Sequence, residues 1–223
     1  VVATARNPSD KIAVIAIDKE SLDNIGRWPW SREVLADMVD KLSAAKAKVI
    51  ATTVFYSEPQ IDPGLVYINK LIDIYGQAGG SPLAPTTSGV PAAPVSAVSA
   101  ANAAVVPPAP ATPLEQFGAV LADAEVNLNT DRRLAESFAK AGNVALPMLF
   151  RLGSPNGRPD HDLPEYIRVN AVKASGGDAP IPTSDVDAMV IESLGKAAAV
   201  IGHLNATLDI DGGIRSEPLV LGY

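Results

Sequence analysis

The sequence predicts an α/β fold with a mostly parallel central sheet, flanking helices, an antiparallel C-terminal hairpin and one long insertion. Short apolar runs rich in β-branched residues alternate with helix-spaced apolar stripes, which is typical of this class. A tract rich in proline and alanine interrupts the alternation: residues 74–114 are 41 residues without a charge and hold eight of the 19 prolines. We expect a single domain over residues 1–223, with residues 77–113 as a low-complexity insertion.

The first half of the chain predicts a strand–helix–strand unit. Residues 11–18 (KIAVIAID) form an apolar run that is typical of a strand buried on both faces. Ser31 is a suitable cap for a following helix, in which apolar residues recur at helical spacing as far as Leu42. Residues 49–56 predict the second strand, parallel to the first. A further helix before the insertion is indicated by Leu65, Ile68, Ile72 and Tyr75.

The second half predicts helices followed by strands. One helix runs from Leu114 towards Leu128, and a second starts near Asp131 and ends at Gly142. Residues 143–150 predict a strand in which a proline indicates an edge or bulge position. The remaining predicted elements are a helix that follows Pro182-Thr183-Ser184 and ends near Gly195, a strand at 198–205, an Asp-Gly turn at 209–213 and a closing strand at 219–223.

Composition excludes several classes of protein. There are 18 Lys and Arg against 25 Asp and Glu, so the net charge is −7 and dispersed, which argues against a nucleic-acid partner. No window approaches the roughly 18 consecutive apolar residues of a membrane-spanning helix. The absence of cysteine rules out disulfides, thiolate nucleophiles and cysteine-based zinc sites. No nucleophile elbow, Walker loop or His-Glu-x-x-His motif is present, so we expect neither an enzyme nor a cofactor or metal.

Five blocks of sequence, taken in their order, resemble the second type of CHASE domain. They are IAVIAIDKESL (12–22), GRWPWSR (26–32), VIATTVFYSEP (49–59), GNVALP (142–147) and the segment 201–219. The resemblance implies an extracytoplasmic sensory domain, associated in bacteria with adenylate or guanylate cyclases, histidine kinases or serine/threonine kinases. It further implies a parent protein with a transmembrane helix before this domain and others after it. The chain departs from the family at Thr52-Thr53, where members often carry an aromatic–Asp pair.

The candidate ligand-binding residues cluster around predicted strand ends, where open α/β sheets bind their ligands. They are Asp18, Ser21, Trp28, Trp30, Arg32, His203 and Asn205. Each has a structural alternative. Asp18 and Ser21 are suited to closing a local turn, and a lone histidine at a strand end is more often a hydrogen-bonded structural residue.

The Trp-Pro-Trp block suggests either a stacking platform or a pair of packing anchors. Pro29 fixes its own φ, from which we expect the two indoles to leave the chain on different sides. Arg32 is the better candidate for charge pairing, with Asp18 or Glu33 as its partner. Two weaker signals, the acidic turn around Asp209 and His161 between two aspartates, fit a tight turn and a solvated loop better than metal sites.

Three functions follow from these observations. The first is a signal-input domain of a bacterial membrane receptor, bound by a small ligand or a protein signal, linked to the parent transmembrane helices, with a homodimer left open. The second is a non-catalytic periplasmic interaction or assembly module that binds a partner through the uncharged insertion or a sheet edge. The third is a periplasmic hydrolase using Asp18 or Asp209. Because the chain begins Val-Val-Ala, we expect it to be a fragment of a longer protein.

Overall fold

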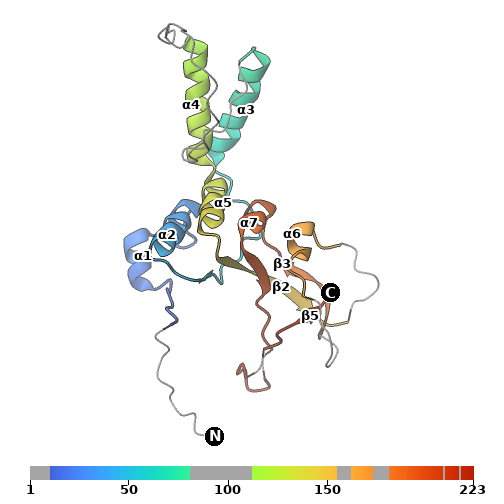
Figure 1. Cartoon of the computed structure of the whole chain (residues 1–223). Helices are drawn as coiled ribbons and strands as arrows, with labels where there is room; N and C mark the ends of the chain where they lie inside the picture. Colours follow the sequence, from blue (N-terminus) through green and yellow to red (C-terminus); the bar gives the residue numbers. More distant parts are fainter. Residues whose placement is uncertain (1–10, 81–111, 155–161, 173–180, 208, 216) are drawn as a thin grey trace, which may run out of the picture. The chain divides into compact units, whose positions relative to one another are not determined.

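A computed structural model describes residues 11–80, 112–154, 162–172, 181–207, 209–215 and 217–223 (Figure 1). The chain divides into two compact units, Val1–Ser31 and Arg32–Tyr223, which are described separately. Among the described residues, no helix combines the length and the apolar character needed to cross a bilayer.

The first unit holds one short helix, α1 (Lys19–Ile25). The strand predicted at residues 11–18 is wrong, because this segment forms no strand and enters none of the described sheet pairings. Its side chains are exposed, with Val14 at 87% and Ile12 at 74% of their full areas. An apolar run indicates that a segment can be buried, but a strand exists only where a neighbour supplies the hydrogen bonds of its backbone.

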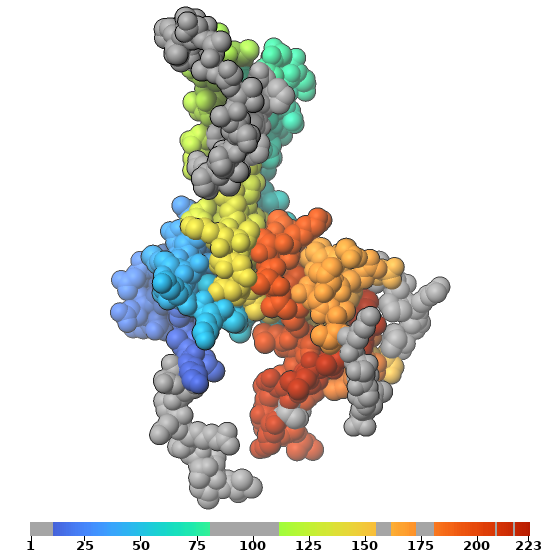
Figure 2. Space-filling model, viewed as in Figure 1, coloured from blue at the N-terminus to red at the C-terminus, as the bar shows by residue number. Residues whose placement is uncertain are grey.

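The second unit repeats one arrangement three times, a helix followed by a strand. The pairs are α2 (Arg32–Ala44) with β1 (Ile50–Ala51), α5 (Thr130–Ala141) with β2 (Val144–Leu152), and α7 (Glu192–Ala197) with β4 (Val200–His203). The three strands are parallel, in the order β1-β2-β4, and α5 lies between α2 and α7 (Figure 2). The strand predicted at 49–56 is therefore present but reduced to two residues.

The rest of the sheet departs from the prediction in detail. Strand β3 (Ile181–Ala188) runs antiparallel to β2, and β5 (Leu221–Gly222) runs parallel to β3. The α/β class is confirmed, but the antiparallel pair is β2–β3 and not a C-terminal hairpin. The helix predicted after Ser184 is wrong before Glu192, because the helical spacing of its apolar residues spans the end of β3 and the start of α7 by coincidence.

Helices α3 (Pro63–Gln77) and α4 (Pro113–Leu128) form an antiparallel hairpin (Figure 1). Both predicted helices are present, and they begin at Pro63 and Pro113 because Asp62 and Thr112 cap their first turns and proline occupies the first helical position. The predicted insertion joins these two helices, and its residues 81–111 lie outside the described part of the chain.

The core lies between the three helices and the parallel strands. Its most buried apolar side chains are Ala36, Val39, Leu134, Phe138, Val144, Leu146, Val190 and Leu194. Since α5 and β2 supply half of this set, the middle helix–strand pair is the centre of the unit. Short α6 (Glu165–Arg168) packs against α7, where the Tyr166 hydroxyl donates a 2.8 Å hydrogen bond to the carbonyl of Val190.

Candidate functional site

One edge of the parallel sheet collects the starts of the three helices. The segment 52–60 leaves β1 at this edge, and the Tyr56 carbonyl accepts a 2.8 Å hydrogen bond from the N–H of Ile191, the residue before α7. Arg32 is the first residue of α2, and Asp131 is the second of α5. Because ligands of open α/β sheets bind beyond the carboxyl ends of their strands, this edge is the candidate site.

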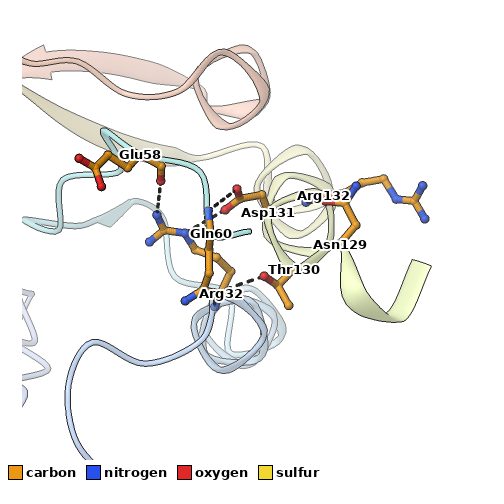
Figure 3. Close-up of polar contacts among 7 residues, drawn as sticks. All are labelled: Arg32, Glu58, Gln60, Asn129, Thr130, Asp131 and Arg132. Atoms are coloured by element: carbon orange, nitrogen blue, oxygen red, sulfur yellow. Dashed lines mark hydrogen bonds and ion pairs between the residues drawn. The ribbon is translucent and has the colours of Figure 1, made fainter. Parts of the chain in front are cut away.

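The edge is held by a cluster of five residues, here called the Arg32 junction: Arg32, Glu58, Gln60, Thr130 and Asp131 (Figure 3). Arg32 Nε lies 3.0 Å from Asp131 Oδ1, and the two side chains are only 12% and 13% exposed. Arg32 Nη2 donates to the Glu58 carbonyl at 3.1 Å, and the Arg32 N–H donates to Gln60 Oε1 at 2.6 Å. One arginine thus joins α2 to both α5 and the segment after β1.

The side chains of Asp131 and Gln60 each accept two hydrogen bonds within the junction. Asp131 Oδ2 accepts the N–H of Gln60 at 2.8 Å, and the Thr130 hydroxyl donates to Gln60 Oε1 at 3.2 Å. The Arg32 guanidinium also lies 4.6 Å from the ring centroid of Tyr56, which is 3% exposed and whose pKa is raised by burial. The junction therefore connects α2, α5 and segment 52–60 through one mostly buried ion pair and the hydrogen bonds around it.

Helix α4 is braced to α5 beside the junction. Asn129 is the only residue between the two helices, and its side chain accepts the N–H of Arg132 at 3.1 Å and donates to Glu125 at 3.0 Å. Arg132 Nη1 lies 2.6 Å from Glu125 Oε2. These contacts join the last turn of α4 to the first turn of α5, in which Asp131 lies.

Sequence reasoning selected Arg32 but gave it the wrong partner. Neither Asp18 nor Glu33 is the carboxylate that binds it; Asp131, 99 positions away, is. Asp131 was assigned only to a helix start, and Gln60 and Thr130 carried no signal. The one clue in the sequence was that Asp131 is an acidic residue in a first helical turn. Acidic residues are common there because they interact favourably with the helix dipole, so this clue did not indicate a partner for Arg32.

His203 and Asn205 lie at the carboxyl end of β4. The Asn205 side chain is largely buried, accepts the N–H of Phe150 at 3.0 Å and donates to the carbonyl of Phe150 at 2.6 Å. The Asn205 side chain therefore makes the two hydrogen bonds to the Phe150 backbone that a neighbouring strand would otherwise make. The N–H of Asn205 donates to His203 Nδ1 at 3.4 Å. These contacts are structural, and a ligand-binding role for either residue stays a prediction.

In the first unit, Asp18 and Ser21 form a helix cap. Asp18 Oδ1 accepts the hydroxyl of Ser21 at 2.6 Å and its N–H at 2.9 Å. Those two hydrogen bonds, the hydroxyl first, lower the pKa of the Asp18 carboxyl. The structural alternative given for this pair describes its contacts, and its ligand-binding role stays a prediction.

The two tryptophans contact each other, so the expectation that they diverge is wrong. The Trp28–Pro29 peptide bond is cis, and the indole centroids lie 5.4 Å apart at 77°. Trp30 Nε1 donates to the Gly26 carbonyl at 2.8 Å. A ligand-binding role for this pair stays a prediction.

The acidic turn at residues 209–213 is present as expected. The N–H of Asp209 donates to the Gly213 carbonyl at 2.8 Å, and Arg215 pairs with both Asp209 and Asp211. The hydrogen bond from Arg215 lowers the pKa of Asp211 to about 2. In the described part of the chain, no three acidic or histidine side chains gather as a metal site would require. His161 lies outside the described residues.

The comparison with protein families decides what this arrangement belongs to. The CHASE2 domain matches residues 2–223. This chain is a member of the CHASE2 family. CHASE2 domains are extracellular sensory domains without catalytic activity, in agreement with the resemblance seen in the sequence. No curated protein and no solved structure matched the chain.

Proposed function

We propose that this CHASE2 domain is the signal-input domain of a bacterial membrane-bound receptor and controls a cytoplasmic nucleotide cyclase or protein kinase. The observation that carries the proposal is the family match over residues 2–223. A sensory domain outside the cell must act through a segment that crosses the membrane, so the domain is tethered there in its parent protein. The signal is a small ligand or a protein that binds the sheet edge.

The Arg32 junction supports a mechanism for signal transfer within the domain. It ties the segment after β1 to two helices through a single guanidinium. A ligand shifts an equilibrium only by its difference in affinity for the two states. A signal that binds segment 52–60 better when it is released from Asp131 would therefore favour a second arrangement of α2 and α5.

The experiment places the chain in a membrane receptor with a cyclase output and measures cyclic nucleotide in cells. Arg32→Gln and Asp131→Asn weaken the junction, and we expect each to change basal output several-fold. The matched control is Lys196→Gln, which removes an ion pair of 2.7 Å in which both side chains are more than 60% exposed.

Stability must be separated from signalling in this test. Urea unfolding of each purified variant gives the fraction folded at the assay temperature. The proposal is supported if output changes in variants that remain more than about 95% folded. It is overturned if the output of every junction variant follows the folded fraction alone, because the junction is then a structural element only.

A further inference from the structure

The α3–α4 hairpin carries a second apolar stripe that its own packing does not use. On α3 the inner stripe is Leu65, Ile68, Ile72 and Tyr75, and Tyr75 is 5% exposed. One position earlier, Tyr67, Leu71 and Ile74 recur at i, i+4 and i+7 with exposures of 67%, 41% and 60%. One position corresponds to about 100° around the helix, so this stripe lies beside the inner one.

Helix α4 shows the same offset. Its inner positions include Gly118 and Leu121, and one position before each of them stand Phe117 and Val120, which are 45% and 65% exposed. Tyr75 and Phe117 contact at 6.2 Å, and Leu128 lies beside Gly64, so the helices are antiparallel. On each helix the exposed stripe is one position before the inner stripe, so it is rotated in the same sense about its own helix axis. Because the two axes run in opposite directions, these equal rotations place both exposed stripes on the same side of the hairpin. Tyr67, Leu71, Ile74, Phe117 and Val120 therefore share one surface, here called the apolar hairpin face.

The opposite side of the hairpin holds smaller and more polar side chains. One position after the inner stripes stand Val66, Asn69 and Asp73 on α3 and Ala119 and Ala122 on α4, and of these only Val66, 43% exposed, is a large apolar residue. The apolar hairpin face has only Lys70 at its border, where the ammonium lies 5.4 Å from the Tyr67 ring centroid. Most of the large exposed apolar side chains of the hairpin thus gather on one side, as expected for a helix pair that packs against a further layer.

We propose that the apolar hairpin face binds the same face of a second copy of the chain, so that two hairpins form a four-helix bundle. Each of the five side chains exposes roughly 100 Å² of surface, so two copies would together bury about 1,000 Å² of apolar surface. This area is the lower bound for a specific interface. In a two-fold dimer a surface packs against its own copy, so like charges on it would face each other. A face without such charges is therefore suited to this symmetry. Antiparallel hairpins with apolar stripes on both helices are the halves of such bundles.

The charges of the hairpin argue against a lipid surface as the occupant. Membrane-bound amphipathic helices carry several Lys or Arg residues on their polar face. Helices α3 and α4 together carry one lysine and no arginine, against the acids Asp73, Glu115, Asp123 and Glu125. The proposal does not depend on the proposed receptor function, because it concerns the association of the chain with itself.

Light scattering with size-exclusion chromatography tests the proposal on the 223-residue chain. We expect a mass of about twice 23.1 kDa at micromolar concentration. Val120→Glu and Ile74→Glu should weaken the dimer at least 100-fold, since a charge would be desolvated at the interface. The matched controls are Ala119→Glu and Asn69→Glu, which add the same charge on the opposite side of the same helices.

A second measurement uses the absence of cysteine from the chain. Val120→Cys should form a disulfide-linked dimer under mild oxidation faster than Ala119→Cys. The proposal is overturned if the wild-type chain is a monomer at about 100 µM, a weak affinity for a specific protein interface. It is equally overturned if Ala119→Glu dissociates the dimer as strongly as Val120→Glu. In the first case, deletion of residues 81–111 that then produces a dimer would identify this segment as the occupant of the face.

Discussion

The ion pair between Arg32 and Asp131 should contribute more to stability than any exposed pair of similar length. The test is a double-mutant cycle with Arg32→Leu, Asp131→Ala and the double variant. Arg32 also binds the Glu58 carbonyl and the ring of Tyr56, so its single substitution costs more than the pair alone. The cycle removes these contributions and leaves the coupling between the two side chains.

The magnitude follows from distance and burial. At 3.0 Å and an effective dielectric constant near 20, the attraction of unit charges is about 5 kcal/mol before desolvation. Desolvation of groups that are 12% and 13% exposed offsets part of this, and hydrogen bonds to charged groups contribute about 1.5–3 kcal/mol net. We therefore expect a coupling energy of about 2 kcal/mol. The pair of Lys196 and Glu192, at 2.7 Å but 63% and 66% exposed, should give about 0.3–0.5 kcal/mol.

Urea unfolding followed by circular dichroism measures both cycles, with the slope of each transition checked for constancy. The two pairs differ little in length and strongly in exposure, so the comparison isolates burial. A coupling energy for Arg32 and Asp131 no larger than that of the exposed pair would refute the reasoning. It would mean that desolvation cancels the attraction and that the junction is held by its neutral hydrogen bonds.

Three further predictions concern single positions. Asn205→Ala leaves an N–H and a carbonyl of β2 without their partner, so the free energy of unfolding should fall by about 2 kcal/mol; no change would favour a ligand-binding role instead. Gly195→Ala places a Cβ 2.6 Å from an aromatic ring and should cost about 1–3 kcal/mol in urea unfolding. Gly202→Ala, with open space around it, is the matched control and should be neutral or slightly stabilising. Burial acts to raise the pKa of Asp40, but the hydrogen bond and charge of Arg133 outweigh it and the pKa is lowered. The stabilisation of the folded state by ionised Asp40 is therefore complete above the ordinary carboxyl pKa of about 3.9, and it is lost as pH falls through the folded-state pKa. The difference in free energy of unfolding between wild type and Asp40→Asn should thus shrink between pH 4 and pH 2.

Local signals in the sequence were sufficient for most helices. Asp62 and Thr112 cap α3 and α4, and Gly142 ends α5 in the left-handed conformation with φ of 65°, so the boundaries are determined by residues within a few positions. The strands were less predictable because their existence depends on partners far along the chain. Residues 11–18 have the composition of a strand but enter none of the described sheet pairings, and β3 was hidden by a helical spacing that crosses an element boundary.

The site was only partly predictable for the same reason. Asp18 and Ser21 are three positions apart, and their contact could be expected from helix capping alone. Arg32 stands out by its position at a helix start, but Asp131 reaches it only after two helices and a long insertion have returned the chain to the same edge. A contact across 99 residues leaves no local trace, so one sequence could indicate the arginine and not the network around it.

The apolar hairpin face and the Arg32 junction are physically connected through α4. Val120 lies on α4, and Asp131 follows the end of that helix by three positions, across the brace of Asn129 and Arg132. A change in the packing of α4 therefore turns the start of α5 and alters the distance between Asp131 and Arg32. Coupling between two binding equilibria is reciprocal, so a dimer that favours one state of the junction must itself be changed by the junction. Asp131→Asn should then alter the dimer dissociation constant although it lies outside the apolar hairpin face, whereas Lys196→Gln should not. An unchanged constant in Asp131→Asn would show that the hairpin and the sheet edge act independently, and that a signal at one does not reach the other through α4.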